Sequence, residues 1–373
     1  MGTALTPAEA ILRRTGPNNI TVLFEAGASG SGGGFDPARA FRGVQMLAEG
    51  AERFCAPLTS GHFEKPRPVD WPRHVCLVEE PNATAAAVMD LTRRLALPSD
   101  RPLWRVLLVN PEGPGWSGVA LQFDHAIADG TRIARHLVAN VRPAARDVAA
   151  TDDLETLGFS DLLPQTDARL LVSPIGLCRV PFAALRGALP DAISHGDALL
   201  RLARAALDTQ PEFEAVPARR KDHATVAKID ALQSGGRLGN HAMMEEIDLS
   251  KPSVKGETAL FRPRRTPLAE SLRMGAARLV PAPLLRRIVQ AEFSRAGIVQ
   301  TIVPVTRRPV PLFGLPLKAI HPAAPALGRP LIALTAARFG DGFDVSVTAH
   351  GADGAAVAGL SERVAAAMAR ALQ

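Results

Sequence analysis

A switch of periodicity near the middle of the chain constrains the fold more than any other feature of the sequence. Residues 117–124, SGVALQFD, alternate in the manner of a β-strand, and residues 130–137, GTRIARHL, repeat at the spacing of an amphipathic helix. A short stretch separates the two patterns. The sequence therefore predicts a strand that turns directly into a helix, with His125 at the strand end and Asp129 and Gly130 at the turn.

His125 has two interpretations. On the predicted strand Leu121, Phe123 and His125 share one face, so the imidazole follows two core side chains into the interior. A histidine in such a place is more often a packed core residue than a catalyst. A neutral imidazole can nevertheless remove a proton from a hydroxyl, amine or thiol near pH 7. Gly130 permits a sharp turn, and Asp129 can hold that turn by pairing with a basic residue.

The length and patterning predict two subdomains. A chain of 373 residues exceeds what one hydrophobic core usually serves. Strand and helix patterns are intermixed throughout, which indicates an α/β (α+β) class with mixed sheets flanked by helices. We expect an N-terminal subdomain over residues 1–142 and a C-terminal subdomain over 191–373. Residues 143–190 carry prolines, mixed charges and weak periodicity, and are expected to cross between the halves.

Caps and turns locate further elements. Strands are predicted over 19–27, 73–80, 102–110, 330–339 and 343–351, with turns at 111–116 and 340–342; helices are predicted after caps at Asp36 and Asn82, from His195, and at the end of the chain. In the last helix, apolar residues recur on one face.

The composition excludes several classes of function. Aromatic residues make up 5% with no tyrosine, which argues against stacking surfaces for single-stranded nucleic acid. The net charge is +6, and the Lys and Arg residues are scattered along the chain. This pattern indicates a solvated basic surface or, as a second interpretation, the binding of a phosphate-bearing small molecule. Cys55, Cys76, Cys178 and the histidines lack metal-ligand spacing, so no metal and no bound cofactor is expected. No apolar run of eighteen or more residues is present, and a cytoplasmic location is expected.

Residues 102–130, PLWRVLLVNPEGPGWSGVALQFDHAIADG, resemble the central signature of the bacterial wax-ester synthase/diacylglycerol acyltransferase family. That signature consists of P-L-W, two strands joined by a short turn, and H-H-x-x-x-D-G. The family belongs to the CoA-dependent acyltransferase superfamily, which also contains chloramphenicol acetyltransferase and the condensation domains of peptide synthetases. Weaker similarities follow in the family's order, from LTPAEAIL at 5–12 to VQTIVPVTRRPVPLFGLPL at 299–317.

The resemblance implies a chloramphenicol-acetyltransferase-like fold of two subdomains with the active site in a tunnel between them. It implies transfer of an acyl group from an acyl-CoA to an acceptor hydroxyl, with His125 as general base and no acyl-enzyme. Asp129 and Gly130 would support the turn. Asp129 is expected to pair with Arg220 of the segment FEAVPARRK, 213–221, which the resemblance makes a strand; Lys221 is the alternative by spacing.

This chain also departs from the family signature. Asp124 replaces the first His of the pair and is expected to affect local packing or contacts with the acceptor. Arg132, with Arg135 after it, is expected to contact CoA phosphates or a carrier protein. His74 and His195 lie in family-like segments without the turn and are expected to be structural.

The implied partners are acyl-CoA and a small-molecule or lipid alcohol, with no nucleic acid. An alternative donor is a carrier-protein thioester, and an alternative product is an amide, in specialised-metabolite biosynthesis. Peripheral contact with a membrane is the alternative to a purely cytoplasmic location. A catalytically silent binding protein on the same fold is the remaining alternative, and the intact set of His125, Asp129 and Gly130 weighs against it.

Overall fold

The computed structural model describes residues 3–15, 18–27, 35–59, 61–98, 100–111, 115–140, 151–167, 173–192, 194–229, 242–252, 276–277, 279–307, 310–325 and 328–373. The strands are β1 (Thr3–Ala4), β2 (Asn19–Ala26), β3 (His62–Phe63), β4 (Val75–Val78), β5 (Trp104–Val109), β6 (Gly118–Asp124), β7 (Thr156–Leu157), β8 (Ile175–Pro181), β9 (His223–Ile229), β10 (Ala242–Asp248), β11 (Ile298–Thr306), β12 (Leu317–Ala323), β13 (Ile332–Phe339) and β14 (Gly342–Ala349). The helices are α1 (Pro7–Thr15), α2 (Pro37–Glu49), α3 (Glu52–Cys55), α4 (Ala85–Arg94), α5 (Gly130–Asn140), α6 (Phe159–Leu162), α7 (Phe182–Ala188), α8 (His195–Asp208), α9 (Ala218–Asp222), α11 (Ala282–Arg295) and α12 (Leu360–Arg370).

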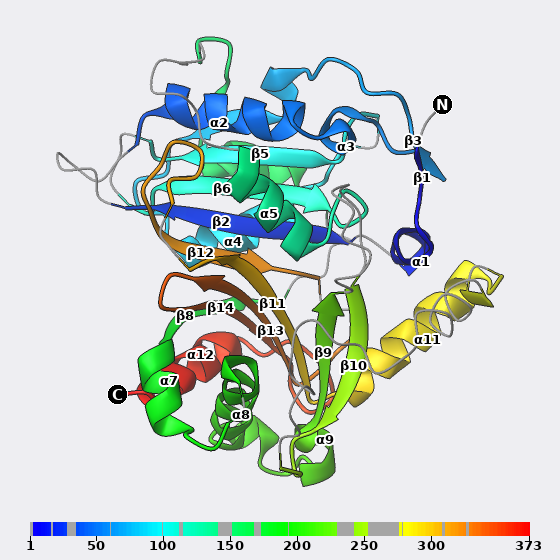
Figure 1. Ribbon diagram of the computed structural model, residues 1–373, viewed down its shortest axis with the longest axis vertical. Coiled ribbons are helices and arrows are strands. Elements are labelled where there is room, and N and C mark those ends of the chain that lie inside the picture. The colour runs from blue at the N-terminus through cyan, green and yellow to red at the C-terminus, as the bar shows by residue number, and fades with distance from the viewer. Residues whose placement is uncertain are drawn as a thin grey trace.

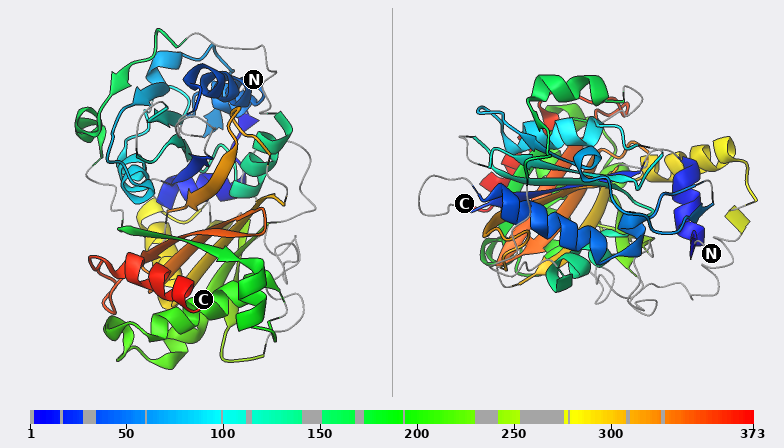
Figure 2. Two further views of the ribbon diagram at one scale, coloured as in Figure 1. Left: turned by 90° about the vertical axis from the view of Figure 1, so that its left-hand side faces the viewer. Right: turned by 90° about the horizontal axis from the view of Figure 1, so that it is seen from above.

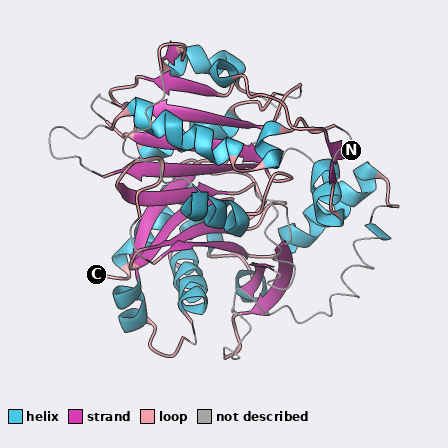
Figure 3. Ribbon diagram, turned by 45° about the horizontal axis from the view of Figure 1, so that its top comes forward, coloured by secondary structure: helices cyan, strands magenta, loops and turns pink. Residues whose placement is uncertain are grey.

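Two mixed six-stranded sheets form the body of the molecule and lie one beyond the other along its longest axis (Figures 1 and 2). The first sheet has the strand order β12-β2-β6-β5-β4-β7, and the second has the order β10-β9-β11-β13-β14-β8. Helices flank both sheets (Figure 3). The predicted class, with mixed sheets flanked by helices, is therefore confirmed.

The first sheet buries both of its faces. Trp104 and Phe123, which are cross-strand partners on β5 and β6, are completely buried on the face that α2 covers. Leu107 and Ala120 are partners on the other face and pack beneath α4. Because apolar residues fill both faces, the strand β6 that leads to His125 is fixed in register from two sides.

The second sheet is built around the predicted C-terminal hairpin. β13 and β14 pair antiparallel from Ile332–Ala349 to Phe339–Gly342, and Gly340 in the turn has a φ of 60°. The left-handed conformation favours glycine, which explains the Gly-Asp-Gly turn. β11 then pairs parallel with β13 and with β9, and α8 and α12 pack on the sheet.

The division of the chain between the sheets is not sequential. β12 comes from the half of the sequence expected to form the second subdomain, yet it pairs antiparallel with β2 of the first sheet. The Asp344 carboxylate on β14 accepts a hydrogen bond of 2.8 Å from the Ile320 amide on β12, and so joins the two sheets. β8, inside the segment expected to be a crossover, forms the edge of the second sheet.

Most predicted elements form with ends shifted by a few residues. The Asp36 side chain caps α2 as predicted, by accepting from the Arg39 amide. The cap of α4 is Thr84, not Asn82, because the Thr84 hydroxyl accepts from the Ala87 amide. The expected strand ending at Lys221 is also wrong: it is the short helix α9, which starts directly after Pro217. Among the described residues, no helix is long and apolar enough to cross a membrane.

Candidate active site

His125 lies directly after β6, where the chain leaves the sheet and turns into α5. Its backbone amide donates to the Asn18 carbonyl at 2.9 Å, which continues the pairing of β6 with β2 by one residue. The Ile127 amide then donates to the Asp124 carbonyl at 2.9 Å, which closes the turn. The backbone that carries the imidazole is therefore held on both sides of His125.

The surroundings of the His125 ring favour its neutral form at rest. Burial is the largest influence and lowers the pKa of the imidazole below its ordinary value. Hydrogen bonding to the backbone of His125 itself and of Ala128, and the carboxylates of Asp129 and Asp124, act in the opposite direction. A neutral imidazole can accept a proton, and the carboxylates of Asp129 and Asp124 lie where they would stabilise the imidazolium that forms.

Asp129 starts α5 and is buried. One carboxylate oxygen accepts from the Arg132 amide at 2.9 Å, and the other lies 3.9 Å from the Arg132 guanidinium. The expected pairing with Arg220 is wrong: that guanidinium donates to the carbonyls of Ala352 (2.9 Å) and Ser294 (3.4 Å). The other candidate, Lys221, pairs with Asp208 at 3.0 Å. Asp129 is thus a helix cap paired within its own helix, a contact that sequence spacing alone could indicate.

Glycine is needed at position 130 for a different reason from the one expected. Its φ is not positive, so the turn itself does not require glycine. A Cβ at this position would lie 2.6 Å from Cγ2 of Val303 on β11. Gly130 therefore allows α5 of the first half to approach a strand of the second half.

Asp124 is buried and completes the turn in a second way. One carboxylate oxygen accepts from the Ala126 amide at 2.8 Å, and the other accepts from Arg13 of α1 at 2.9 Å. A histidine could not accept both bonds while also carrying a negative charge for Arg13. The replacement in the family-like motif is therefore matched by a partner elsewhere in this chain.

Arg53 of α3 holds the same turn from the other side. Its Nη1 donates to the carbonyl of Ala126 at 2.7 Å and to Glu9 Oε1 at 2.6 Å, and its guanidinium lies over the Phe63 ring at 4.6 Å. Glu9 has an exposed fraction of 0%, and its second oxygen accepts from the Thr6 amide at 2.7 Å. We call Glu9, Arg53, Arg13 and Asp124 the turn clamp.

Three members of the turn clamp, Glu9, Arg53 and Arg13, were not predicted from the sequence. A local signal existed for Glu9, because Thr6 and Glu9 have the spacing of a capping box and form one. Nothing local indicates that Arg53, 44 residues later, meets the other oxygen of that carboxylate. Arg132 is buried beside the clamp, and its pKa is lowered by burial while Asp129 and Glu9 oppose that shift.

The other histidines singled out in the sequence lie away from this turn. His74 is buried, donates from Nδ1 to the Trp104 carbonyl at 2.8 Å and stacks on the Trp104 ring at 4.3 Å. His195 stacks on Phe182 at 4.4 Å at the start of α8. Within the described residues no cluster of three potential metal ligands exists.

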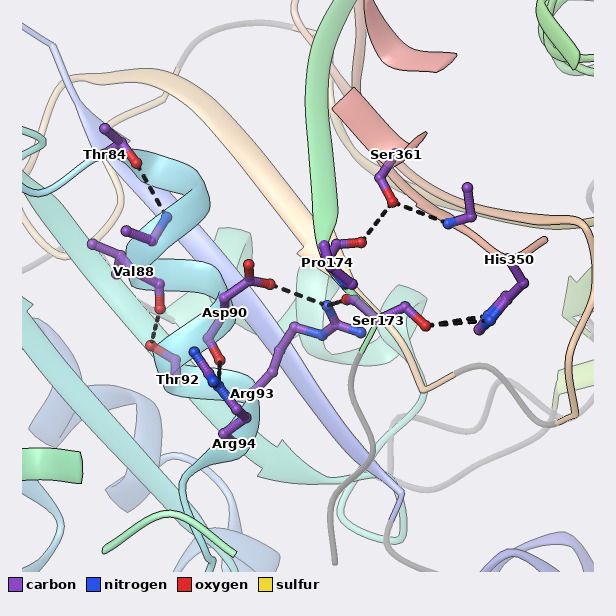
Figure 4. A network of polar contacts seen from close by, with 12 residues as sticks. Thr84, Val88, Asp90, Thr92, Arg93, Arg94, Ser173, Pro174, His350 and Ser361 are labelled. Atoms are coloured by element: carbon purple, nitrogen blue, oxygen red, sulfur yellow. Dashed lines mark hydrogen bonds and ion pairs between the residues drawn. The ribbon is translucent and has the colours of Figure 1, made fainter. Parts of the chain in front are cut away.

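A second, partly buried polar cluster joins the two halves, where α4 meets the segment before β8 (Figure 4). Arg93 donates to the Ser173 carbonyl at 3.0 Å and lies 3.6 Å from Asp90, and the Ser173 hydroxyl lies 3.3 Å from the nearer His350 ring nitrogen. Ser361 bridges from α12 to the Pro174 carbonyl at 2.7 Å. We call this cluster the α4–β8 junction; it contains none of the motif residues.

Comparison with solved structures identifies the fold. The wax ester synthase/diacylglycerol acyltransferase from Marinobacter aquaeolei VT8 is similar over 99% of this chain and 98% of that chain, with a TM-score of 0.62 and 14% identity. The first condensation domain of the CDA synthetase is similar over 100% of this chain and 96% of that chain, with a TM-score of 0.57 and 17% identity. This chain has the acyltransferase and condensation-domain fold.

The likeness covers the whole of the molecule, including β12 and β8. A double mutant of the starter condensation domain of the rhizomide synthetase, in complex with C8-CoA and Leu-SNAC, is similar over 100% of this chain and 93% of that chain. Its TM-score is 0.51 at 13% identity. No family model matches the sequence, and no curated protein matches it significantly. The comparisons therefore establish the two-subdomain fold and not the reaction.

Proposed function

We propose that this chain is an acyltransferase that moves an acyl group from an acyl-CoA thioester to an acceptor hydroxyl, with His125 as general base. The observation that carries the proposal is the desolvated His125 imidazole at a strand-to-helix turn that Arg53 and Asp124 hold rigidly. The fold supports it, since similar structures bear the names of acyltransferases and condensation domains.

The proposed step needs one base and no covalent intermediate. The basic nitrogen of His125 takes the proton of the acceptor hydroxyl while the acceptor oxygen attacks the thioester carbonyl carbon. The new C–O bond forms, the C–S bond breaks, and the leaving CoA thiolate takes the proton back from the imidazolium. The carboxylates of Asp124 and Asp129 stabilise that imidazolium. General-base action of this kind contributes roughly 10²–10⁴-fold to the rate.

The roles proposed for the neighbouring residues follow from their exposure. Arg132 is buried beside the turn clamp, whereas Arg135 of the same helix is exposed. We therefore assign contacts with donor phosphates to Arg135 and a positioning role to Arg132. The acceptor is proposed to be a small-molecule or lipid alcohol, reached in the cytoplasm or at a membrane surface.

A second candidate is transfer from a carrier-protein thioester, or formation of an amide. The similarity to a condensation domain over 100% of this chain, at a TM-score of 0.57, favours it. The same base would serve, because an amine nucleophile also loses a proton as it attacks the thioester. The two candidates differ in the donor and in the acceptor atom, and the same assay separates them.

The test is release of free thiol from a panel of acyl-CoAs with alcohol and amine acceptors. His125→Ala should lower the acceptor-dependent rate by roughly 10²–10⁴-fold. The control is His62→Ala, because His62 is an exposed histidine of the same half. Release with a carrier-protein thioester but with no CoA ester would select the second candidate. Acceptor-dependent release that survives His125→Ala would refute the mechanism. If no donor releases thiol, a catalytically silent binding protein on the same fold would be the remaining interpretation.

A further inference from the structure

Three polar residues form a row across the first sheet, on the face opposite Trp104 and Phe123. Arg105 on β5 is the direct partner of Gln122 on β6, and Gln122 is the partner of Thr21 on β2. Cross-strand partners project from the same face of a sheet. Beside the row, Leu23, Leu107 and Ala120 of this face pack beneath α4. The row begins where α4 has ended, since the Gln122 amide donates to the carbonyl of Leu95, the C-cap of α4, at 3.0 Å.

Each residue of the row leaves one buried polar atom without a hydrogen-bond partner. These atoms are Arg105 Nη1, Gln122 Oε1 and Thr21 Oγ1. Gln122 and Thr21 have exposed fractions of 0%. Buried polar groups in folded proteins nearly always have partners. Gln122 and Thr21 are closed to solvent, whereas Arg105 is partly exposed, so Arg105 is the residue of the row that a partner from outside the protein can reach.

Arg105 also lacks a counter-charge. It forms no ion pair and no hydrogen bond with the side chains or backbone of the described residues. Burial lowers its pKa, and the charged side chain that adds to this shift is Arg101, a second cation. The nearby Cys76 thiol offers no counter-charge, because burial raises its pKa to about 11. Arg101 is itself paired with Asp100 at 3.0 Å. Because a partly buried cation without a counter-charge is costly, an external anion would stabilise it.

Arg105 lines a surface pocket of about 520 Å³. The chain after α4 forms one wall and residues 164–167 form another, joined by a bond of 3.0 Å from the Ala96 amide to the Gln165 carbonyl. Gln165, Thr166 and Asp167 supply the remaining polar lining. Asp167 brings one carboxylate to the pocket, but it is not among the groups that act on the Arg105 charge. The volume is at the small end of ligand sites in proteins.

We propose that this pocket binds a small oxyanion, phosphate or a phosphate monoester, through the Arg105 guanidinium. A planar guanidinium matches two oxygens of a phosphate at once, which a lysine cannot do. The site lies on the opposite face of the first sheet from the Trp104 core and shares no residue with the turn clamp. It is therefore independent of the proposed acyl transfer.

The experiment is thermal unfolding and calorimetric titration with inorganic phosphate, against sodium chloride at equal ionic strength. Phosphate should raise the unfolding temperature of the wild type in a saturable way, because it binds the folded state. Arg105→Gln should weaken phosphate binding at least about tenfold, the loss expected when a charge-assisted bond is removed. Arg42→Gln is the matched control, since Arg42 is a partly buried arginine paired with Glu49 on α2.

Arg105→Gln should also fold at least as well as the wild type without phosphate, because it removes an unpaired cation. Arg105→Lys keeps the charge but loses the planar fork, and should bind phosphate more weakly than the wild type. Equal phosphate responses in the wild type and in Arg105→Gln would overturn the proposal. So would the absence of any response in the wild type beyond that to sodium chloride.

Discussion

The turn clamp and the α4–β8 junction are both partly buried polar clusters, but their ion pairs differ in closeness. In the turn clamp, Arg53 lies 2.6 Å from Glu9, and Arg13 lies 2.9 Å from Asp124. In the junction, Arg93 is 3.6 Å from Asp90, and Asp90 Oδ1 has no hydrogen-bond partner. Burial raises the pKa of Asp90 to about 6.

The two clusters also differ in the segment of the chain that they hold. The turn clamp binds main-chain atoms, the Ala126 carbonyl and the Ala126 amide, and so fixes the backbone next to His125. The junction also binds main-chain atoms, the carbonyls of Ser173 and Pro174, but these belong to the segment before β8 and not to the motif turn. The closer ion pairs therefore lie beside the turn that carries His125, and the longer one lies where the two halves meet.

The largest expected effect is that of Arg53→Met. It would leave the Glu9 carboxylate buried without its cation and the Ala126 carbonyl without its donor, so it should lower the free energy of unfolding by about 3–5 kcal/mol. Denaturant unfolding measures the change. The double variant Glu9→Gln/Arg53→Met removes the stranded charge and should recover roughly half of the loss. A double variant as unstable as the single one would show that the clamp acts by packing and not by charge.

Gly130→Ala should have the next largest effect, at the contact between the turn and the second half. The new Cβ would meet Val303 Cγ2 at 2.6 Å, and overpacking of this kind costs about 1–3 kcal/mol. Gly130→Ala/Val303→Ala should relieve much of that cost. Gly187→Ala is the control, because a Cβ at Gly187 has no neighbour within 4 Å. An unchanged unfolding temperature for Gly130→Ala would mean that α5 can move away from β11 without a loss of folding stability.

The smallest effect is expected for Asp90→Asn, and it depends on pH. The folded-state pKa of Asp90 is raised to about 6 from 3.8, chiefly by burial, so the unfolded chain loses this proton first. Stability contributed by the protonated folded group is therefore lost as pH rises from about 4 to about 6. The two-unit shift sets an upper bound of about 3 kcal/mol, and partial exposure reduces it to about 1–2 kcal/mol.

The measurement for Asp90→Asn is the free energy of unfolding at several pH values, compared with the wild type. The difference between the two curves should change between about pH 4 and pH 6 and be flat above that range. Taking the difference removes the contribution of His350, whose pKa is lowered by burial and by nearby Arg329. A constant difference across this range would show that Asp90 titrates normally and that the junction is as well paired as the turn clamp.

The elements and their order could be predicted from the sequence because local interactions determine them. The Asp36 cap, the alternation of β6, the helical repeat of α5 and the glycine turn of the hairpin each depend on residues within a few positions of one another. The same holds for the place of His125 at the end of a strand. Asp129 belongs in this group too, since its partner is three residues away.

Other features were decided by packing between distant segments. The sequence could not place β12 beside β2, pair Arg53 with Glu9, or bring Arg13 to Asp124 across 111 residues. Nor could it reveal that Gly130 is required by a side chain of β11, or that Arg105 has no partner. Charge and shape complementarity between such segments depend on the three-dimensional arrangement of complete sheets. Local periodicity gives the strand and the turn that present His125, and the tertiary structure supplies the charges that hold it there.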